Sequence, residues 1–119
     1  MYEKVAFTMY PIKDSDRARA FYGETLGLKI GSKASSGAWT EYDLPGGGCL
    51  ALFKTTDLEP SANSASIALE VSDLDAEKAR LKGLGVEFKA DNIESPVCRM
   101  AVILDSEGNS IILHELKKK

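Results

Sequence analysis

The sequence has few cysteines, a single histidine and no long hydrophobic run. Cys49 and Cys98 fall on different expected strands without CxxC spacing, so we expect two reduced thiols. The one histidine, His114, excludes a two-histidine iron or zinc site within one subunit. No stretch is long enough to span a bilayer, and no apolar leader precedes the first expected strand. A cytoplasmic location is therefore expected.

Basic residues do not outnumber acidic ones. The formal net charge is −3, and no basic stripe alternates with aromatic side chains. This balance argues against nucleic acid and against an anionic membrane surface as partners. What is present is ordinary for a globular protein: 44% hydrophobic and 28% charged residues in a chain of 119. That length predicts one domain with a sizeable core.

An apolar strand, a polar turn and an amphipathic helix follow one another near the start of the chain. The pattern predicts a strand over Val5–Tyr10 and a helix over Ser15–Leu26 that stops at Gly27. Asp14 or Ser15 can cap this helix by accepting hydrogen bonds from its first backbone N–H groups. Glycine tolerates the left-handed conformation that commonly ends a helix.

The same arrangement returns at Ser66–Phe88. It begins with a strand over Ser66–Val71, and Ser72 with Asp75 approximates a capping box. Three leucines predict the buried face of the second helix: Leu74, Leu81 and Leu84. The chain is therefore a strand–helix unit used twice.

Three further strands are expected after each helix. In the first half they cover Lys29–Lys33, Ala38–Leu44 and Cys49–Lys54. In the second half they cover Val86–Ala90, Cys98–Leu104 and Ser110–Leu116, with a loop over Asp91–Pro96. One domain, 1–119, would thus contain module one (about 1–55), a linker (56–65) and module two (66–119).

The repeat, the phrase FYGETLGLK (residues 21–29) and the hairpin DSEGN (residues 105–109) resemble the vicinal oxygen chelate superfamily. This superfamily includes glyoxalase, bleomycin resistance proteins and extradiol dioxygenases. The resemblance implies an α+β fold in which two βαβββ modules form a cleft, and it implies a homodimer.

Metal-dependent relatives place His or Glu at four positions related by the repeat. By resemblance these correspond here to Phe7, Ala51 or Leu52, Ser66, and Ile112. None is a usual ligand of a divalent metal. We therefore expect that the family metal site is lost and that no cofactor is needed.

The period of two along a strand predicts which side chains face the cleft. Placing Ile67, Leu69 and Val71 against the helix leaves the alternate positions for the cleft, although two registers remain open for Glu41. The expected ligand-binding residues are Phe7, Met9, Glu41, Ser66, Ala68, Met100, Val102 and Ile112.

Three side chains could carry chemistry in that cleft. Glu70 at its end would have its pKa raised by desolvation and could transfer a proton with His114. Cys98 falls on the same strand face as His114, which could draw off the thiol proton and leave a reactive thiolate.

The expected function is binding of a small organic molecule in an apolar cleft, without a metal. One alternative is a metal-free lyase or isomerase that uses Glu70 and His114 for acid–base chemistry. The other is a metal enzyme whose ligands have moved to Glu41, Glu70 and His114. Whether the protein is an enzyme stays open at this point.

Overall fold

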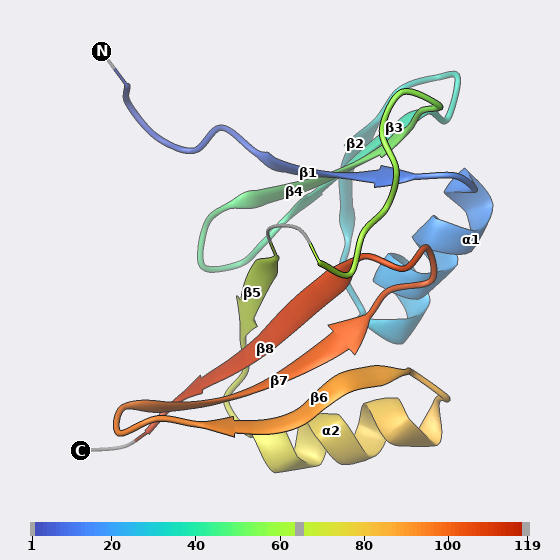
Figure 1. Cartoon of the computed structure of the whole chain (residues 1–119). Helices are drawn as coiled ribbons and strands as arrows, with labels where there is room; N and C mark the ends of the chain where they lie inside the picture. The colour runs from blue at the N-terminus through green and yellow to red at the C-terminus, as the bar shows by residue number, and fades with distance from the viewer. Residues whose placement is uncertain (1, 64–65, 118–119) are drawn as a thin grey trace. The chain divides into compact units, whose positions relative to one another are not determined.

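The computed structural model describes residues 2–63 and 66–117. The last two positions of the expected linker, 64 and 65, lie outside this part. The chain forms two compact units, Met1–Pro60 and Ser61–Lys119, and each contains one helical segment and one four-stranded sheet (Figure 1). The predicted α+β fold of two βαβββ modules is confirmed.

The elements follow the order strand, helix, three strands in each unit. The first unit contains β1 (Thr8–Ile12), α1 (Ser15–Arg19), η1 (Ala20–Thr25), β2 (Ile30–Lys33), β3 (Trp39–Asp43) and β4 (Cys49–Lys54). The second contains β5 (Ile67–Glu70), α2 (Leu74–Gly83), β6 (Phe88–Glu94), β7 (Cys98–Leu104) and β8 (Ser110–Leu116).

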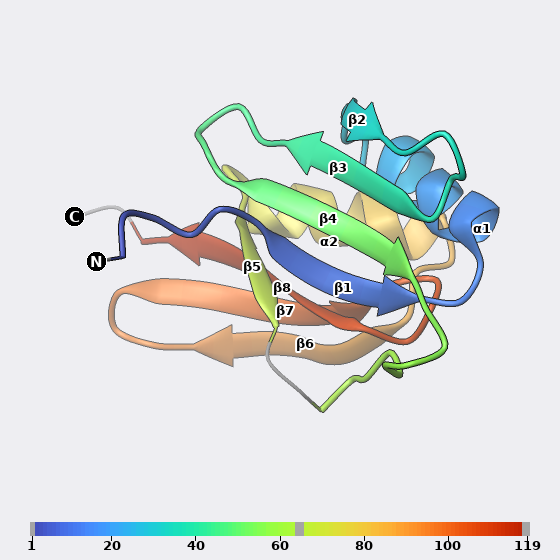
Figure 2. The ribbon, with the colours of Figure 1, turned by 90° about the horizontal axis from the view of Figure 1, so that it is seen from above.

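The first strand of each unit pairs in parallel with the last. The strand orders are β1-β4-β3-β2 and β5-β8-β7-β6, and Figure 2 shows β4 between β1 and β3. Thr8 pairs with Leu50, and Ile67 pairs with Ile111. All other strand pairs are antiparallel.

In the first unit the core lies between the sheet and the helical segment. Tyr22 of η1 and Tyr42 of β3 are fully buried, and their rings stack with centroids 6.0 Å apart. The remaining large buried side chains alternate along the strands, as one face of a sheet requires: Tyr10, Ile12, Leu50 and Leu52. The opposite face, turned away from the unit's own helix, is called the helix-free face below.

In the second unit Leu74 and Leu81 of α2 are fully buried, as predicted. They pack with the helix-facing side chains of β7 and β8, namely Ala101, Ile103, Ile111 and Leu113. The prediction for Leu84 is wrong, because its side chain is 57% exposed. Leu84 follows the last turn of α2, where the backbone leaves the helical path and the i, i+3, i+4 spacing no longer defines a face.

Both helices begin at an aspartate. Asp14 accepts a hydrogen bond from the Arg17 N–H at 2.9 Å, in agreement with the predicted cap. In the second unit Asp73 accepts from the Ala76 N–H at 3.0 Å, so the predicted capping box of Ser72 and Asp75 is wrong. The aspartate side chain reaches the third N–H after it, and Ser72 lies one residue too early.

The predicted helix Ser15–Leu26 is present but is not a regular α-helix. Its first turn, α1, passes into the π-helical segment η1. There the Leu26 N–H bonds to the Phe21 carbonyl at 2.9 Å, a step of five residues. Gly27 follows with φ +77°, as expected for the helix stop.

Several strand limits differ from the prediction. β1 begins at Thr8 rather than Val5 and runs through Pro11, which an edge strand tolerates because one side of its backbone needs no hydrogen bonds. β6 runs to Glu94, across the expected loop Asp91–Pro96. Its polar, exposed side chains resemble a loop in sequence, yet β6 is an edge strand paired with β7 through two irregular steps.

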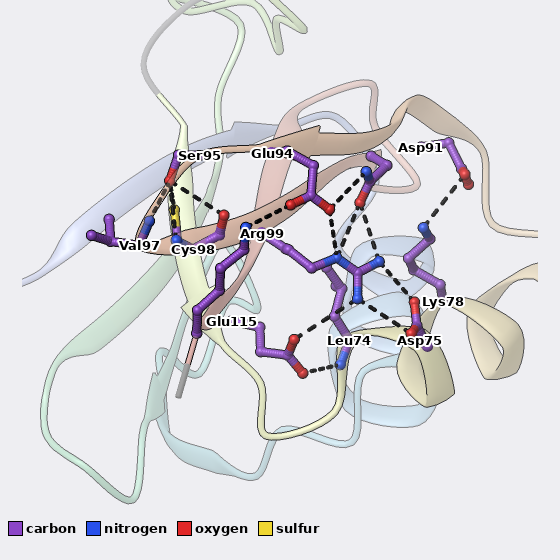
Figure 3. Close-up of polar contacts among 12 residues, drawn as sticks. Leu74, Asp75, Lys78, Asp91, Glu94, Ser95, Val97, Cys98, Arg99 and Glu115 are labelled. Atoms are coloured by element: carbon purple, nitrogen blue, oxygen red, sulfur yellow. Dashed lines mark hydrogen bonds and ion pairs between the residues drawn. The ribbon is translucent and has the colours of Figure 1, made fainter. Parts of the chain in front are cut away.

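The start of α2 is held to its sheet by charged groups. Arg99 of β7 donates to the Asp75 carboxylate at 2.9 and 3.2 Å and also pairs with Glu94 (Figure 3). Glu115 of β8 accepts a hydrogen bond from the Leu74 N–H at 2.8 Å (Figure 3). These contacts satisfy a free N–H group of the first helical turn, which has no partner within the helix.

None of the helices in residues 2–63 and 66–117 combines the length and hydrophobicity needed to cross a bilayer.

The two ends of α2 provide a matched stability test. We expect Leu81→Ala to lower the free energy of unfolding by about 2–5 kcal/mol, because it empties a fully buried site. Leu84→Ala, the same change at an exposed position, should cost less than about 1 kcal/mol. Urea unfolding followed by circular dichroism measures both. Equal losses would contradict the burial of Leu81 against the sheet.

Candidate functional site

On the helix-free face of the first sheet, the strand registers settle the position of Glu41. Ala51 pairs with Met9 on one side and with Glu41 on the other, so these three side chains form a row across the sheet. Glu41 therefore shares the helix-free face with Trp39, while the alternate residues Thr40 and Tyr42 point to the core. The predicted residues Phe7, Met9 and Glu41 thus belong to one surface.

Three aromatic rings gather on this face. Phe7 meets Trp39 edge to face at 5.2 Å between centroids, and Trp39 meets Phe53 at 5.7 Å. The Trp39 indole N–H donates to Glu41 Oε2 at 2.7 Å, which fixes the orientation of the ring. Phe7 stays 46% exposed, so the cluster presents apolar surface that its own unit does not cover.

Beside the rings lies a polar corner that the sequence analysis did not single out. The Cys49 thiol donates to Glu41 Oε1 at 3.4 Å, and Cys49 lies directly opposite Asp43 on the neighbouring strand. Burial and the two nearby carboxylates raise the pKa of Cys49 to about 11. Cys49 is therefore a protonated donor and not a thiolate. The alternation of side chains along β4 would have placed it on this face.

The helix-free face of the second sheet carries the remaining predicted ligand-binding residues. Met100 pairs with His114 and Val102 pairs with Ile112, so these four side chains share one face, as predicted. Ala68 is the parallel neighbour of Ile112. Leu116 lies on the same face, because it pairs with Cys98 and lies two residues beyond His114.

Glu70 and His114 are brought together by the parallel pairing of β5 and β8. The His114 Nδ1 and Glu70 Oε1 atoms lie 2.6 Å apart, and Glu70 Oε2 accepts from the Leu116 N–H at 3.2 Å. The predicted rise in the Glu70 pKa is wrong. The hydrogen bond to His114 and that to Leu116 lower the pKa of Glu70, and they outweigh desolvation because its side chain is 57% exposed.

Cys98 does not share a hydrogen bond with this pair. It lies diagonally across from His114 in the sheet, and its buried thiol meets the Ser95 hydroxyl at 3.1 Å (Figure 3). The predicted activation of Cys98 by His114 is not seen in this geometry, because the Cys98 thiol contacts the Ser95 hydroxyl and not the imidazole.

The registers also decide between Ala51 and Leu52 at the second position related to the family's metal ligands. In the first unit Thr8 pairs with Leu50, and the equivalent pair in the second unit is Ile67 with Ile111. The residue after Leu50 is therefore equivalent to the residue after Ile111, so that Ala51, and not Leu52, corresponds to Ile112. The Ala51 side chain lies on the helix-free face, whereas Leu52 points to the core. In the parts of the chain that the structure describes, no three His, Cys, Asp or Glu side chains are grouped so that they could hold a metal ion.

The architecture and these two faces define a protein of paired βαβββ units. A family model for the Glyoxalase/Bleomycin resistance protein/Dioxygenase superfamily matches residues 4–113, and the chain belongs to this superfamily. The resemblance seen in the sequence is thereby confirmed. No curated protein sequence matches the chain.

Solved structures share the fold over nearly the whole chain. TnmS3, an antibiotic binding protein from Streptomyces sp. CB03234, is 27% identical with a TM-score of 0.83, and 98% of each chain is covered. A glyoxalase/bleomycin resistance protein from the same strain is 28% identical with a TM-score of 0.75, covering 90% of this chain and 96% of that one. A glyoxalase/dioxygenase from Nostoc punctiforme is 19% identical with a TM-score of 0.77, and the match covers 97% of this chain and 92% of that one. At this identity the likeness shows the fold alone.

The contact between Glu70 and His114 predicts a pH effect. Because the folded pKa of Glu70 lies below its ordinary value of 4.5, the contact stabilises the fold above that pH. The stability difference between the wild type and Glu70→Gln should therefore shrink as the pH falls from about 5 through the folded pKa. Urea unfolding over this range measures it.

Carboxyl-carbon NMR supplies the control. His114→Leu should raise the Glu70 pKa toward 4.5 and leave the lowered pKa of Glu94, which Lys117 holds, unchanged. An unchanged Glu70 pKa would contradict the contact.

The raised pKa of Cys49 predicts a slow thiol. In a Cys98→Ser background, labelling by a disulfide reagent at pH 8 should be roughly a hundredfold slower than for a cysteine with the ordinary pKa of 9.0. Glu41→Gln should recover part of the rate, because it removes one cause of the raised pKa while burial, the largest single cause, remains. Urea-unfolded protein is the control for full reactivity. Rapid labelling of the folded protein at pH 8 would refute the assignment.

Proposed function

We propose that the chain binds a small, largely apolar organic molecule on the helix-free faces of its sheets. The observation that carries this proposal is the aromatic cluster of Phe7, Trp39 and Phe53. Aromatic rings provide a large contact area with little side-chain entropy to lose, and they stack on flat ligands. A partly exposed ring such as Phe7 gains most from a ligand that covers it.

The comparison with TnmS3 supports this proposal. That protein is described as an antibiotic binding protein, and 98% of each chain is covered. An antibiotic-like molecule that can cover the aromatic cluster is therefore the class of ligand that we infer. Fold alone does not determine function, so the argument depends on the aromatic cluster and not on the architecture.

Metal-free binding is part of the proposal. The positions that correspond to the family's metal ligands hold Phe7, Ala51, Ser66 and Ile112, and none of these side chains donates strongly to a divalent cation. Their apolar members add contact area for an organic ligand instead. A relocated site at Glu41, Glu70 and His114 gains no support from the grouping of side chains in the described residues.

A second candidate function is acid–base catalysis, and the Glu70–His114 contact favours it. A carboxylate on one imidazole nitrogen orients the ring and leaves the other nitrogen to exchange a proton with a substrate. Glu70 also borders a hollow of about 480 Å³ that Arg80 and Asp73 help to line. A metal-free lyase or isomerase could use this pair. The lowered pKa of Glu70 makes it the orienting group, with His114 as the proton carrier.

The homodimer implied by the family resemblance remains a proposal.

Trp39, the only tryptophan in the chain, offers a direct test. A thermal-shift screen of aromatic natural products, antibiotics included, should identify ligands that quench Trp39 fluorescence. Phe7→Ala should weaken the binding of such a ligand about fivefold, because part of the roughly 1.5–3 kcal/mol for burying a large apolar side chain is lost. Tyr2→Ala, the same kind of truncation at a fully exposed ring, should change nothing. Affinity should be the same with and without a chelator.

The same ligands separate the two functions. If the protein only binds, His114→Gln should leave affinity unchanged and no product should form. If it catalyses, His114→Gln should lower turnover by about 10²–10⁴ with little effect on binding. Product formation that depends on His114 would refute the proposal that the protein only binds and would support the metal-free lyase or isomerase.

A further inference from the structure

A hollow of about 400 Å³ opens on the helix-free face of the second unit. Val102 and Ile112 form its apolar floor, and Ser66, Ser110 and Lys89 supply its polar groups. Val102 and Ile112 are direct cross-strand partners, so their side chains form a continuous apolar patch. The hollow therefore offers apolar contact and hydrogen bonding side by side.

The polar floor is a pair of hydroxyl groups, one from Ser66 just before β5 and one from Ser110 at the start of β8. Ser66 Oγ and Ser110 Oγ are in direct contact, and Ser110 is only 2% exposed. A hydroxyl both donates and accepts, so such a pair can offer an O–H to an oxygen atom of a ligand placed above it.

Lys89 supplies a positive charge at the rim. Its ammonium donates to the Ala62 carbonyl and to the Asn63 side-chain oxygen at 2.8 Å, and both acceptors are uncharged. No Asp or Glu is among the described residues that line the hollow. An ammonium group has three N–H donors, so two neutral acceptors neither saturate it nor neutralise its charge.

Lys89 has uncharged hydrogen-bond partners, unlike the other cationic side chains described in the second unit. Five of them pair with carboxylates: Lys78, Arg80, Lys82, Arg99 and Lys117. A charge held over an apolar hollow by neutral groups is positioned to interact with an anion that enters it.

We propose that this hollow binds an anionic oxygen group, such as a carboxylate, phenolate or sulfonate, of an otherwise apolar ligand. Lys89 and the Ser66 hydroxyl donate to the oxygen atoms, and the carbon skeleton lies on Val102 and Ile112. This inference rests on the proposed small-molecule binding and adds the charge of the ligand to it. Neutral ligands of equal size should bind more weakly.

Two fluorescent probes of similar aromatic structure test the charge. One is anionic, 8-anilinonaphthalene-1-sulfonate, and the other is neutral, N-phenyl-1-naphthylamine. The wild type should bind the anionic probe with one-to-one stoichiometry. Lys89→Gln should weaken that binding about tenfold, the effect of losing one hydrogen bond from a charged group. Binding of the neutral probe should change less than about twofold.

Matched variants control for general effects. Lys89→Arg should retain most of the affinity for the anionic probe, and Lys82→Gln, which removes a lysine already paired with Asp91, should have no effect. Ser66→Ala should weaken binding of the anionic probe and leave binding of the neutral probe unchanged. Thermal unfolding of each variant checks the fold, and amide chemical shifts locate the probe at Ser66, Lys89 and Ile112.

The outcomes separate the two proposals. If the wild type binds both probes and Lys89→Gln leaves the anionic one unaffected, the anion site is refuted and small-molecule binding stands. If the anionic probe shifts amides only outside this hollow, the anion site is likewise refuted. If neither probe binds and the natural-product screen also finds no ligand, small-molecule binding itself is refuted.

Discussion

The parallel pairing of the first and last strands of each unit is the constraint on which the rest depends. It fixes Thr8 beside Leu50 and Ile67 beside Ile111. Side chains alternate along a strand, so a slip of one residue would exchange the core face with the helix-free face. The large buried residues of β4 and β8 make such a slip costly, because they would lose their contacts with the helix. The position of Met9 beside Ala51 and the Glu70–His114 contact follow from this register.

The fold and much of the second face were predictable from the sequence because both depend on local patterns. Cys98–Leu104 and Ser110–Leu116 are present with the predicted limits, since apolar runs on either side of a turn define a hairpin. The polar residues of β6 were predicted as a loop, because an edge strand needs no apolar side chains. The pKa of Glu70 was predicted in the wrong direction. Its hydrogen bonds come from residues more than forty positions away, which periodicity does not reveal.

The two sheets show how one scaffold can carry different surfaces. By the repeat, Trp39 corresponds to Met100 and Phe53 to His114. The first unit therefore presents packed aromatic rings where the second presents a flexible thioether and an imidazole. These differences lie on the helix-free faces, where substitution does not disturb the buried leucine and isoleucine layers. A surface of this kind can change its ligand while the fold is preserved.

The π-helical segment η1 accounts for a difference in length between the repeats. From Asp14 to Gly27 the chain has one residue more than from Asp73 to Gly85, although both stretches run from a helix cap to a left-handed glycine. The wide turn of η1 absorbs this additional residue without displacing either end. Removing one residue from η1 should return that stretch to a regular α-helix. The same deletion should move Tyr22 out of its stacking contact with Tyr42.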